Sequence, residues 1–177
     1  SNPLAEDVEG GRPAKENALQ TAASRVQDRG CAMNALWRVR EAAIRDKKMR
    51  FTSLLHHVDE VLLRDAYLAL NRDATPGVDG VTWQEYGEGL EERLRNLKDR
   101  VHGGTYRAEP SKRTFIPKAD GRMRPLGIAS LEDKIVQHAV VTVLNQIYEV
   151  DFQGFSYGMR PGRNQHQALD ALWVAFM

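Results

Sequence analysis

The sequence of 177 residues predicts an α+β fold that is mostly helical and contains one small antiparallel β-hairpin. The helices are indicated by apolar residues that recur every three or four positions along most of the chain. The hairpin is indicated by two short apolar patches, residues 114–116 and 126–128, which flank the turn signal Asp120-Gly121. This length is enough for one medium-sized domain, or for one domain with a tail.

The N-terminal third of the chain predicts a tail followed by a helical extension. Residues 1–14 predict a disordered tail, because their prolines and glycines leave little to bury. Residues 15–50 predict a helical extension made of two helices with a break at Gly30. Its second helix carries a basic face, which is more typical of solvated surface than of RNA contact. The apolar residues expected to face the core are Leu19, Ala23, Val26, Met33, Leu36, Trp37 and Ile44.

The middle of the chain predicts two amphipathic helices joined by a loop. Residues 52–70 favour one helix that buries Leu55, Val58, Leu62, Ala66 and Ala69. Residues 71–81 form the loop. Thr82 and Glu85 then have the spacing of a capping box, and a helix from residue 83 to 101 is expected to stop at residues 103–104, both glycines. His56 and His57 are adjacent, so on a helix they diverge by roughly 100° and predict no metal site.

The C-terminal part predicts two further helices. Ser130 is a candidate N-cap, followed by acidic residues in the first turn. The stripe of that helix expected to be buried consists of Ile135, Ala139, Val143 and Ile147. Asn164 is a candidate N-cap of a last helix, which carries Ala168, Leu169, Leu172, Trp173 and Phe176. Because this helix stops in apolar residues, we expect the chain to be a fragment of a longer protein.

The composition excludes several classes of protein. No run of about 18 apolar residues is present and the polar start lacks a signal peptide, so a cytoplasmic protein without a membrane partner is expected. The single cysteine, Cys31, cannot form an internal disulfide and is interpreted as a small core residue. The net charge is only +1, so any binding of nucleic acid must come from local patches.

One such patch surrounds the hairpin. Residues 100–125 contain seven Lys or Arg side chains against two acidic ones. Lys118 and Arg124 lie six positions apart across the turn, so both could reach one phosphate group from neighbouring strands. The spacing therefore predicts a polyanion site. The alternative reading of the same charges is a solvated basic loop tip.

Three stretches in the same order and spacing resemble the fingers region of bacterial group II intron reverse transcriptases, also called maturases. They are residues 71–82 (NRDATPGVDGVT), 116–128 (IPKADGRMRPLGI) and 155–166 (FSYGMRPGRNQH). The resemblance covers roughly residues 50–177 and is more specific than a lone glycine-rich loop. Met159 departs from it, because the family usually has Phe at that position.

The resemblance implies that residues 51–177 are the incomplete fingers subdomain of a right-hand polymerase, with the palm missing. Lys118 and Arg124 match the fingers residues that grip the triphosphate of the incoming dNTP. The family's palm aspartates hold Mg²⁺ for nucleotidyl transfer. No Tyr-Xaa-Asp-Asp sequence is present here, so we expect no catalytic residue and no metal ligand in this chain. Mg²⁺ is expected for the full-length enzyme, and the isolated fragment is expected to be inactive.

Four further cations are candidates for contact with RNA, namely Lys112, Arg113, Arg160 and Arg163. For the neighbouring Phe155 and Tyr157, core packing is favoured over base stacking. The implied partners are intron RNA, template RNA, dNTP and, in the full protein, a DNA target, in support of reverse transcription, intron splicing and mobility. Whether the apolar C-terminal helix also makes a homodimer stays open at this level.

Two alternatives remain. The chain could be a stand-alone RNA-binding or assembly module that keeps the fingers fold. It could also come from a reverse transcriptase that serves no intron, such as a diversity-generating, defence or adaptation-module enzyme. A palm with paired aspartates after residue 177 would favour an enzyme over the module.

Overall fold

The computed structural model describes the backbone of residues 12–177 and the side chains from residue 24 onward. Its elements, in chain order, are α1 (Arg12–Arg45), the short 3₁₀ helix η1 (Leu55–His57), α2 (Glu60–Ala69), α3 (Trp83–Gly87), α4 (Leu90–His102), β1 (Lys112–Pro117), β2 (Met123–Ile128), α5 (Leu131–Asp151) and α6 (Gln165–Phe176). The predicted α+β class, mostly helical with a two-stranded antiparallel sheet, is confirmed. Most of the predicted tail, residues 1–11, lies outside the described residues, and α1 begins at Arg12.

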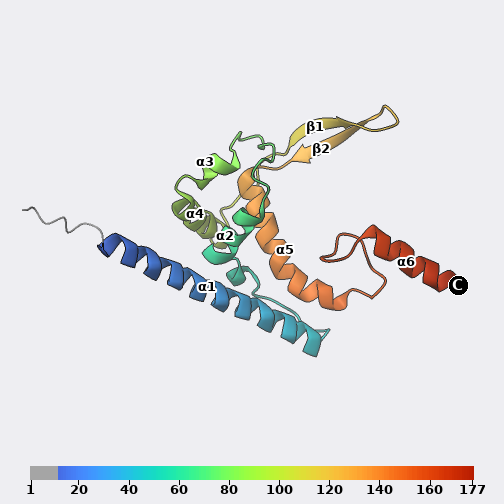
Figure 1. Ribbon diagram of the computed structural model, residues 1–177, viewed down its shortest axis with the longest axis horizontal. Coiled ribbons are helices and arrows are strands. Elements are labelled where there is room, and N and C mark those ends of the chain that lie inside the picture. The colour runs from blue at the N-terminus through green and yellow to red at the C-terminus, as the bar shows by residue number, and fades with distance from the viewer. Residues whose placement is uncertain (1–11) are drawn as a thin grey trace, which may run out of the picture.

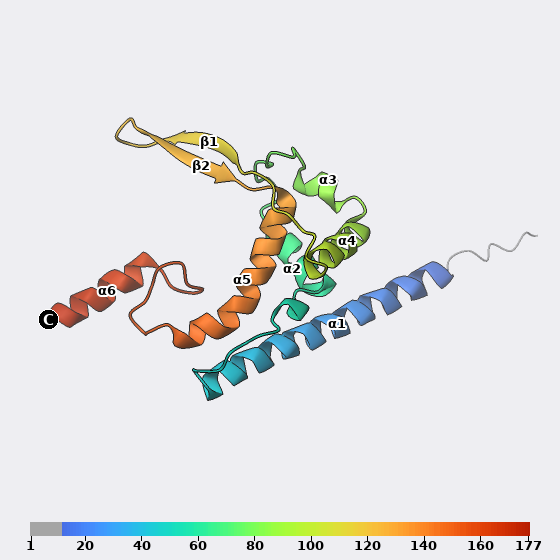
Figure 2. The same ribbon diagram turned by 180° about the vertical axis from the view of Figure 1, so that it is seen from behind.

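The helices gather around α5, which crosses the middle of the molecule (Figure 1). It packs against α1 on one side and α2 on another, and α2 packs in turn against α4. The hairpin β1–β2 projects from the N-terminal end of α5, and α6 lies beyond its C-terminal end. Seen from behind, the hairpin and α6 again project to the same side of α5 (Figure 2).

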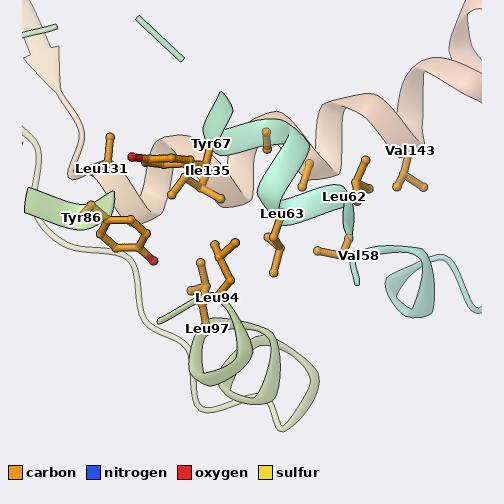
Figure 3. Packing of buried hydrophobic residues seen from close by; sticks show 12 residues of the cluster. Val58, Leu62, Leu63, Tyr67, Tyr86, Leu94, Leu97, Leu131, Ile135 and Val143 are labelled. Carbon is orange, nitrogen blue, oxygen red and sulfur yellow. The ribbon is translucent and has the colours of Figure 1, made fainter. Parts of the chain in front are cut away.

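The core lies between α2, α4 and α5 (Figure 3). On α5 it is built from residues spaced by four, so Ile135, Ala139 and Val143 are buried as predicted, whereas Ile147 stays partly exposed. The cluster comprises Val58, Leu62, Leu63, Ala66, Tyr67, Tyr86, Leu94, Leu97, Leu131, Ile135, Ala139 and Val143.

A reciprocal pair of hydrogen bonds fastens α3 to α2. The Tyr67 hydroxyl donates to the Trp83 carbonyl at 2.8 Å, and the Trp83 indole N–H donates to the Tyr67 carbonyl at 3.1 Å. The two rings stack with their centroids 4.5 Å apart. The polar ends of the buried Tyr67 and the partly buried Trp83 are thereby satisfied, which lets the rings pack as apolar surface.

The predicted break at Gly30 is wrong, because α1 runs through it without interruption. A helical glycine costs only about 1 kcal/mol relative to alanine, and tertiary contacts on both sides of Gly30 offset that cost. Before it, Arg29 pairs with Asp65 of α2 at 2.6 Å. After it, Val39 and Ala43 are buried. The predicted buried face is also wrong in part, since Val26, Met33, Trp37 and Ile44 are largely exposed.

Two predicted helix boundaries are wrong for local reasons. Residues 52–70 do not form one helix, because the Asp59 carboxylate accepts the Leu62 N–H at 2.8 Å and starts α2 afresh. The helix expected from residue 83 to 101 is split between α3 and α4 by Gly89, which adopts the left-handed conformation with φ 72°.

The predicted caps are confirmed. Thr82 and Glu85 form a capping box, Ser130 caps α5, and Asn164 caps α6. Cys31, in contrast, is exposed on α1 and is not the core residue that we expected. Over the described residues, no helix combines the length and apolar character that crossing a bilayer requires.

Candidate nucleotide and RNA interface

The hairpin register decides which cations share a face. Ile116 of β1 lies opposite Arg124 of β2, and Pro117 lies opposite Met123. Beyond the strand ends, the Lys118 N–H donates to the Arg122 carbonyl at 2.8 Å, and the Gly121 N–H closes the turn on the Lys118 carbonyl at 3.0 Å. Gly121 has φ 79°, a backbone conformation that favours glycine.

Lys118 and Arg124 belong to the same face of this hairpin. Side chains alternate between faces along a strand, and directly opposite residues share a face, so Lys118, two positions after Ile116, is on the face of Arg124. Both residues line one open hollow of about 400 Å³ near the turn. The spacing argument from the sequence is therefore consistent with the geometry.

The third cation at this turn is neutralised locally. Arg122 donates to one Asp120 carboxylate oxygen from Nε at 2.9 Å and from Nη2 at 2.6 Å. Hydrogen bonds from Arg122 hold the pKa of Asp120 below its ordinary value. The bonds from the arginine side chain have the larger effect, and the bond from its backbone N–H the smaller one. Among the ion pairs of the described residues, none involves Lys118 or Arg124. These two cations are the ones at the hollow that remain available to an external anion.

The structure separates the RNA candidates Lys112 and Arg113. They are neighbours on β1, so they point to opposite faces of the hairpin. Lys112 is on the face of Lys118 but at the other end of β1, with Thr114 and Ile116 between them on that face. Arg113 is on the reverse face, together with the exposed apolar side chains of Phe115 and Met123.

The guanidinium group of Arg160 is buried and bonded within the chain. Its side chain is only 7% exposed and forms an ion pair with Glu149 at 3.0 Å. The same guanidinium donates to the carbonyls of Gln153 and Ser156 at 3.1 and 2.8 Å and covers the Phe152 ring. These bonds occupy the donors with which an arginine would hold phosphate, so the geometry favours Arg160 as the fastener of the loop between α5 and α6.

Arg163 lies in the same loop and is exposed. Its guanidinium lies 5.3 Å from the centre of the Tyr157 ring, and Tyr157 is half-buried. Phe155 is 75% exposed, so the expectation that it packs in the core is wrong for the chain described here. Phe155, Tyr157 and α6 line an apolar hollow of about 640 Å³. Burial of Phe155 could not be judged from sequence, because it depends on where α6 lies.

The sequence analysis missed Asp133, which is buried where the hairpin joins α5. From the sequence it is only one of two acidic residues, Glu132 and Asp133, in the first turn of that helix. A signal was present, since Ser130 followed by an acid three positions later has capping-box spacing. That spacing does not reveal that other segments of the chain donate to the same carboxylate.

The described side chains offer no site for the implied Mg²⁺. Among the residues with described side chains, no cluster of three or more His, Cys, Asp or Glu is placed to bind a metal ion. Mg²⁺ requires several oxygen ligands at short range. The described residues do not fit the metal, and no chemical step is assigned to a metal here.

Comparison with known proteins finds relatives that share part of this sequence. The chain is 39% identical to the protein YkfC of Escherichia coli strain K12 over 131 residues, which are 72% of this chain and 34% of YkfC. It is 40% identical to the group II intron-encoded protein LtrA of Lactococcus lactis over 83 residues, 46% of this chain and 14% of LtrA. It is also 46% identical over 67 residues to an uncharacterized 91 kDa protein in the cob intron of Schizosaccharomyces pombe, 38% of this chain and 8% of that protein.

The chain thus spans about a third of the length of YkfC and less of the other two relatives. No protein-family profile matches it.

Proposed function

This chain belongs with the group II intron-encoded proteins, to which it is homologous over part of their length, and from that premise we propose that it is the fingers part of an RNA-directed DNA polymerase. Its β1–β2 hairpin holds the triphosphate of the incoming dNTP. The observation that carries the proposal is the pair Lys118 and Arg124, which line one hollow from two sides of a turn while the adjacent Arg122 is neutralised by Asp120.

The chemistry suits nucleotidyl transfer. When a dNTP reacts, negative charge builds up on the departing pyrophosphate, and fixed cations at that point stabilise the transition state more than mobile ions in water do. Lysine supplies a point charge and arginine a planar pair of donors, so the two can hold different phosphate oxygens at once. In this proposal the chain binds and orients the nucleotide, and the isolated chain does not polymerise. Mg²⁺ chemistry belongs to carboxylates elsewhere in the complete enzyme.

RNA is the proposed second ligand. The face of the hairpin that holds Lys118 and Arg124 near the turn also carries Lys112 at the start of β1, and Arg163 lies exposed in the loop before α6. We assign intron RNA and template RNA to these cations together with Arg113. Arg160 is left out of this surface because its donors are engaged internally. Support of intron splicing and mobility, and contact with a DNA target, are functions of the complete protein.

The direct test is binding of dTTP to this chain by isothermal titration calorimetry. Lys118→Ala and Arg124→Ala should each weaken binding by at least about tenfold, because each removes a charge-assisted contact to phosphate. In the complete polymerase the same changes should lower dNTP use on the order of 10²-fold, as loss of one charge-stabilising donor does at other active sites.

The matched control is Arg107→Ala, which removes the same charge outside the hollow. Arg107 donates to the Gly104 and Tyr106 carbonyls and does not line the nucleotide site. Equal affinity in all four proteins would refute the nucleotide site. If this chain then bound RNA but no dTTP, the stand-alone RNA-binding module would be the better description.

A further inference from the structure

We infer that Asp133 is a positioning residue that sets the direction in which the hairpin leaves the helical body, and thereby places Lys118 and Arg124. The inference rests on the proposed function only for the role of those two cations. It concerns the junction between β2 and α5. This junction is about ten residues away in sequence from Arg124, which lines the hollow near the hairpin turn.

Asp133 is bonded to both ends of the hairpin. On the side that enters β1, the Tyr106 hydroxyl donates to Oδ1 of Asp133, and the Glu109 N–H donates to Oδ2 at 3.1 Å. On the side that leaves β2, the Ser130 hydroxyl donates to Oδ2 at 2.9 Å. The carboxylate therefore ties together the two segments that would otherwise act as a hinge.

The burial of this carboxylate makes the tie specific. Asp133 is 3% exposed, and a buried carboxylate must have its oxygens hydrogen-bonded. Burial and the bond to Asp133 both raise the pKa of Tyr106, so its hydroxyl stays protonated and keeps donating. Moving the β1 end would leave Oδ1 without its Tyr106 partner, and moving the β2 end would remove one of the two donors to Oδ2. The low local dielectric makes both losses costly.

Neighbouring contacts hold the same junction from two other sides. Glu132 accepts from Arg100 of α4 at 2.7 Å and from the Tyr86 hydroxyl at 3.2 Å. The backbone of the loop between α2 and α3 also lies against Ser130, since a Cβ added to Gly77 would come within 2.6 Å of the Ser130 Cα. Among the described residues, the hydrogen bonds at the hairpin turn stay within the hairpin, so its direction is set at its base.

The experiment measures hairpin direction and nucleotide binding in the same chain. Met123→Cys places a spin label on the reverse face of the hairpin, and the native Cys31 on α1 carries the second. Double electron–electron resonance then gives the distribution of distances between hairpin and body. We expect one narrow distribution for the otherwise unchanged protein.

Asp133→Asn should widen that distribution and weaken dTTP binding by roughly tenfold, because a misplaced binding group loses much of its contribution. The amide has only one acceptor oxygen and cannot serve all three donors. Tyr106→Phe removes a single donor and should have a smaller effect in the same direction. It keeps the test valid if Asp133→Asn does not fold, and thermal unfolding identifies which variants are folded.

Asp170→Asn is the matched control, because Asp170 is exposed on α6, away from this junction. Folded Asp133 and Tyr106 variants with a distribution as narrow as the control would overturn the inference, whatever their affinity for dTTP. A widened distribution in a chain that never binds dTTP would support the positioning role and refute the proposed nucleotide function instead.

Discussion

At the scale of single residues, the loop between α5 and α6 shows that charge alone does not identify a binding residue. Arg160 and Arg163 are three positions apart and both were candidates for RNA contact. The structure surrounds Arg160 with Glu149, two carbonyls and an aromatic ring, whereas Arg163 is exposed. Only the second has a guanidinium in reach of an external phosphate. Sequence could not separate them, because the partners of Arg160 are defined by how the chain folds back on α5.

This contrast predicts opposite effects of two alanine substitutions. Arg160→Ala should destabilise the chain by about 2–4 kcal/mol, because it leaves the largely buried Glu149 carboxylate without its partner. Arg163→Ala should change stability by less than about 0.5 kcal/mol, as substitutions of exposed residues usually do, but should weaken RNA binding. Urea unfolding and RNA filter binding of both variants measure the two effects. A loss of RNA affinity with unchanged stability in Arg160→Ala would contradict the structural role.

At the scale of elements, glycines account for one wrong boundary and one unexpected continuity. Gly89, in a left-handed conformation, lies between α3 and α4 and divides the one helix predicted there. Gly30 was expected to break α1 but sits inside it. The same residue type thus interrupts one helix and not another, and the difference comes from the contacts of the neighbouring turns. Local sequence predicts that a glycine weakens a helix, but not whether the rest of the fold offsets that loss.

Glycine-to-alanine substitutions at Gly30 and Gly77 should therefore change the free energy of unfolding in opposite directions. Gly30→Ala should raise the free energy of unfolding by about 0.5–1 kcal/mol, because a Cβ there meets nothing within 4 Å and alanine favours the helix. Gly77→Ala should lower it by about 1–3 kcal/mol, since the new Cβ would collide with the backbone of Ser130. Chemical denaturation measures both. Destabilisation by Gly30→Ala would mean that α1 is interrupted in solution.

The capping box at the start of α3 makes the free energy of unfolding depend on pH in the acidic range. Bonds from the Thr82 backbone and side chain lower the pKa of Glu85 from its usual value of 4.5. The unfolded chain then takes up this proton at a higher pH than the folded chain, so the stabilisation is present above about pH 4.5 and is lost as the pH falls through the lower folded-state pKa. Thermal unfolding of the Glu85→Gln variant, which cannot titrate at this position, should depend less steeply on pH below 4.5. Equal slopes would show that the bond is not maintained in solution.

At the scale of the whole molecule, the hairpin and α6 both extend from the core carried by α5 (Figure 1). The hairpin brings cations to one of these projections, and the loop before α6 brings Arg163 to the other. None of the residues of α6 is buried, and Trp173 is 68% exposed. The charged side chains proposed to bind RNA are thus distributed over two projecting parts of a molecule whose net charge is only +1.

Binding of RNA by these local patches should depend steeply on salt, because each phosphate that is neutralised releases counterions. For single-stranded RNA, the slope of log K against log salt should be about −0.7 per phosphate contact, and Arg163→Ala should reduce its magnitude by about one such contact. Filter binding between low and moderate salt measures this slope. An affinity that is the same across that range would contradict the proposed electrostatic interface.

The sequence by itself determined the features that depend on short-range chemistry. These are the hairpin around Asp120-Gly121, the caps at Thr82, Ser130 and Asn164, and most of the buried stripe of α5. Turn residues, capping side chains and apolar periodicity all act within a few positions of the chain. Only the tertiary structure decided that α1 continues through Gly30, that Arg160 is engaged internally, and that Asp133 joins both ends of the hairpin. Each of these depends on side chains that are distant in sequence and meet only when the helices pack around α5.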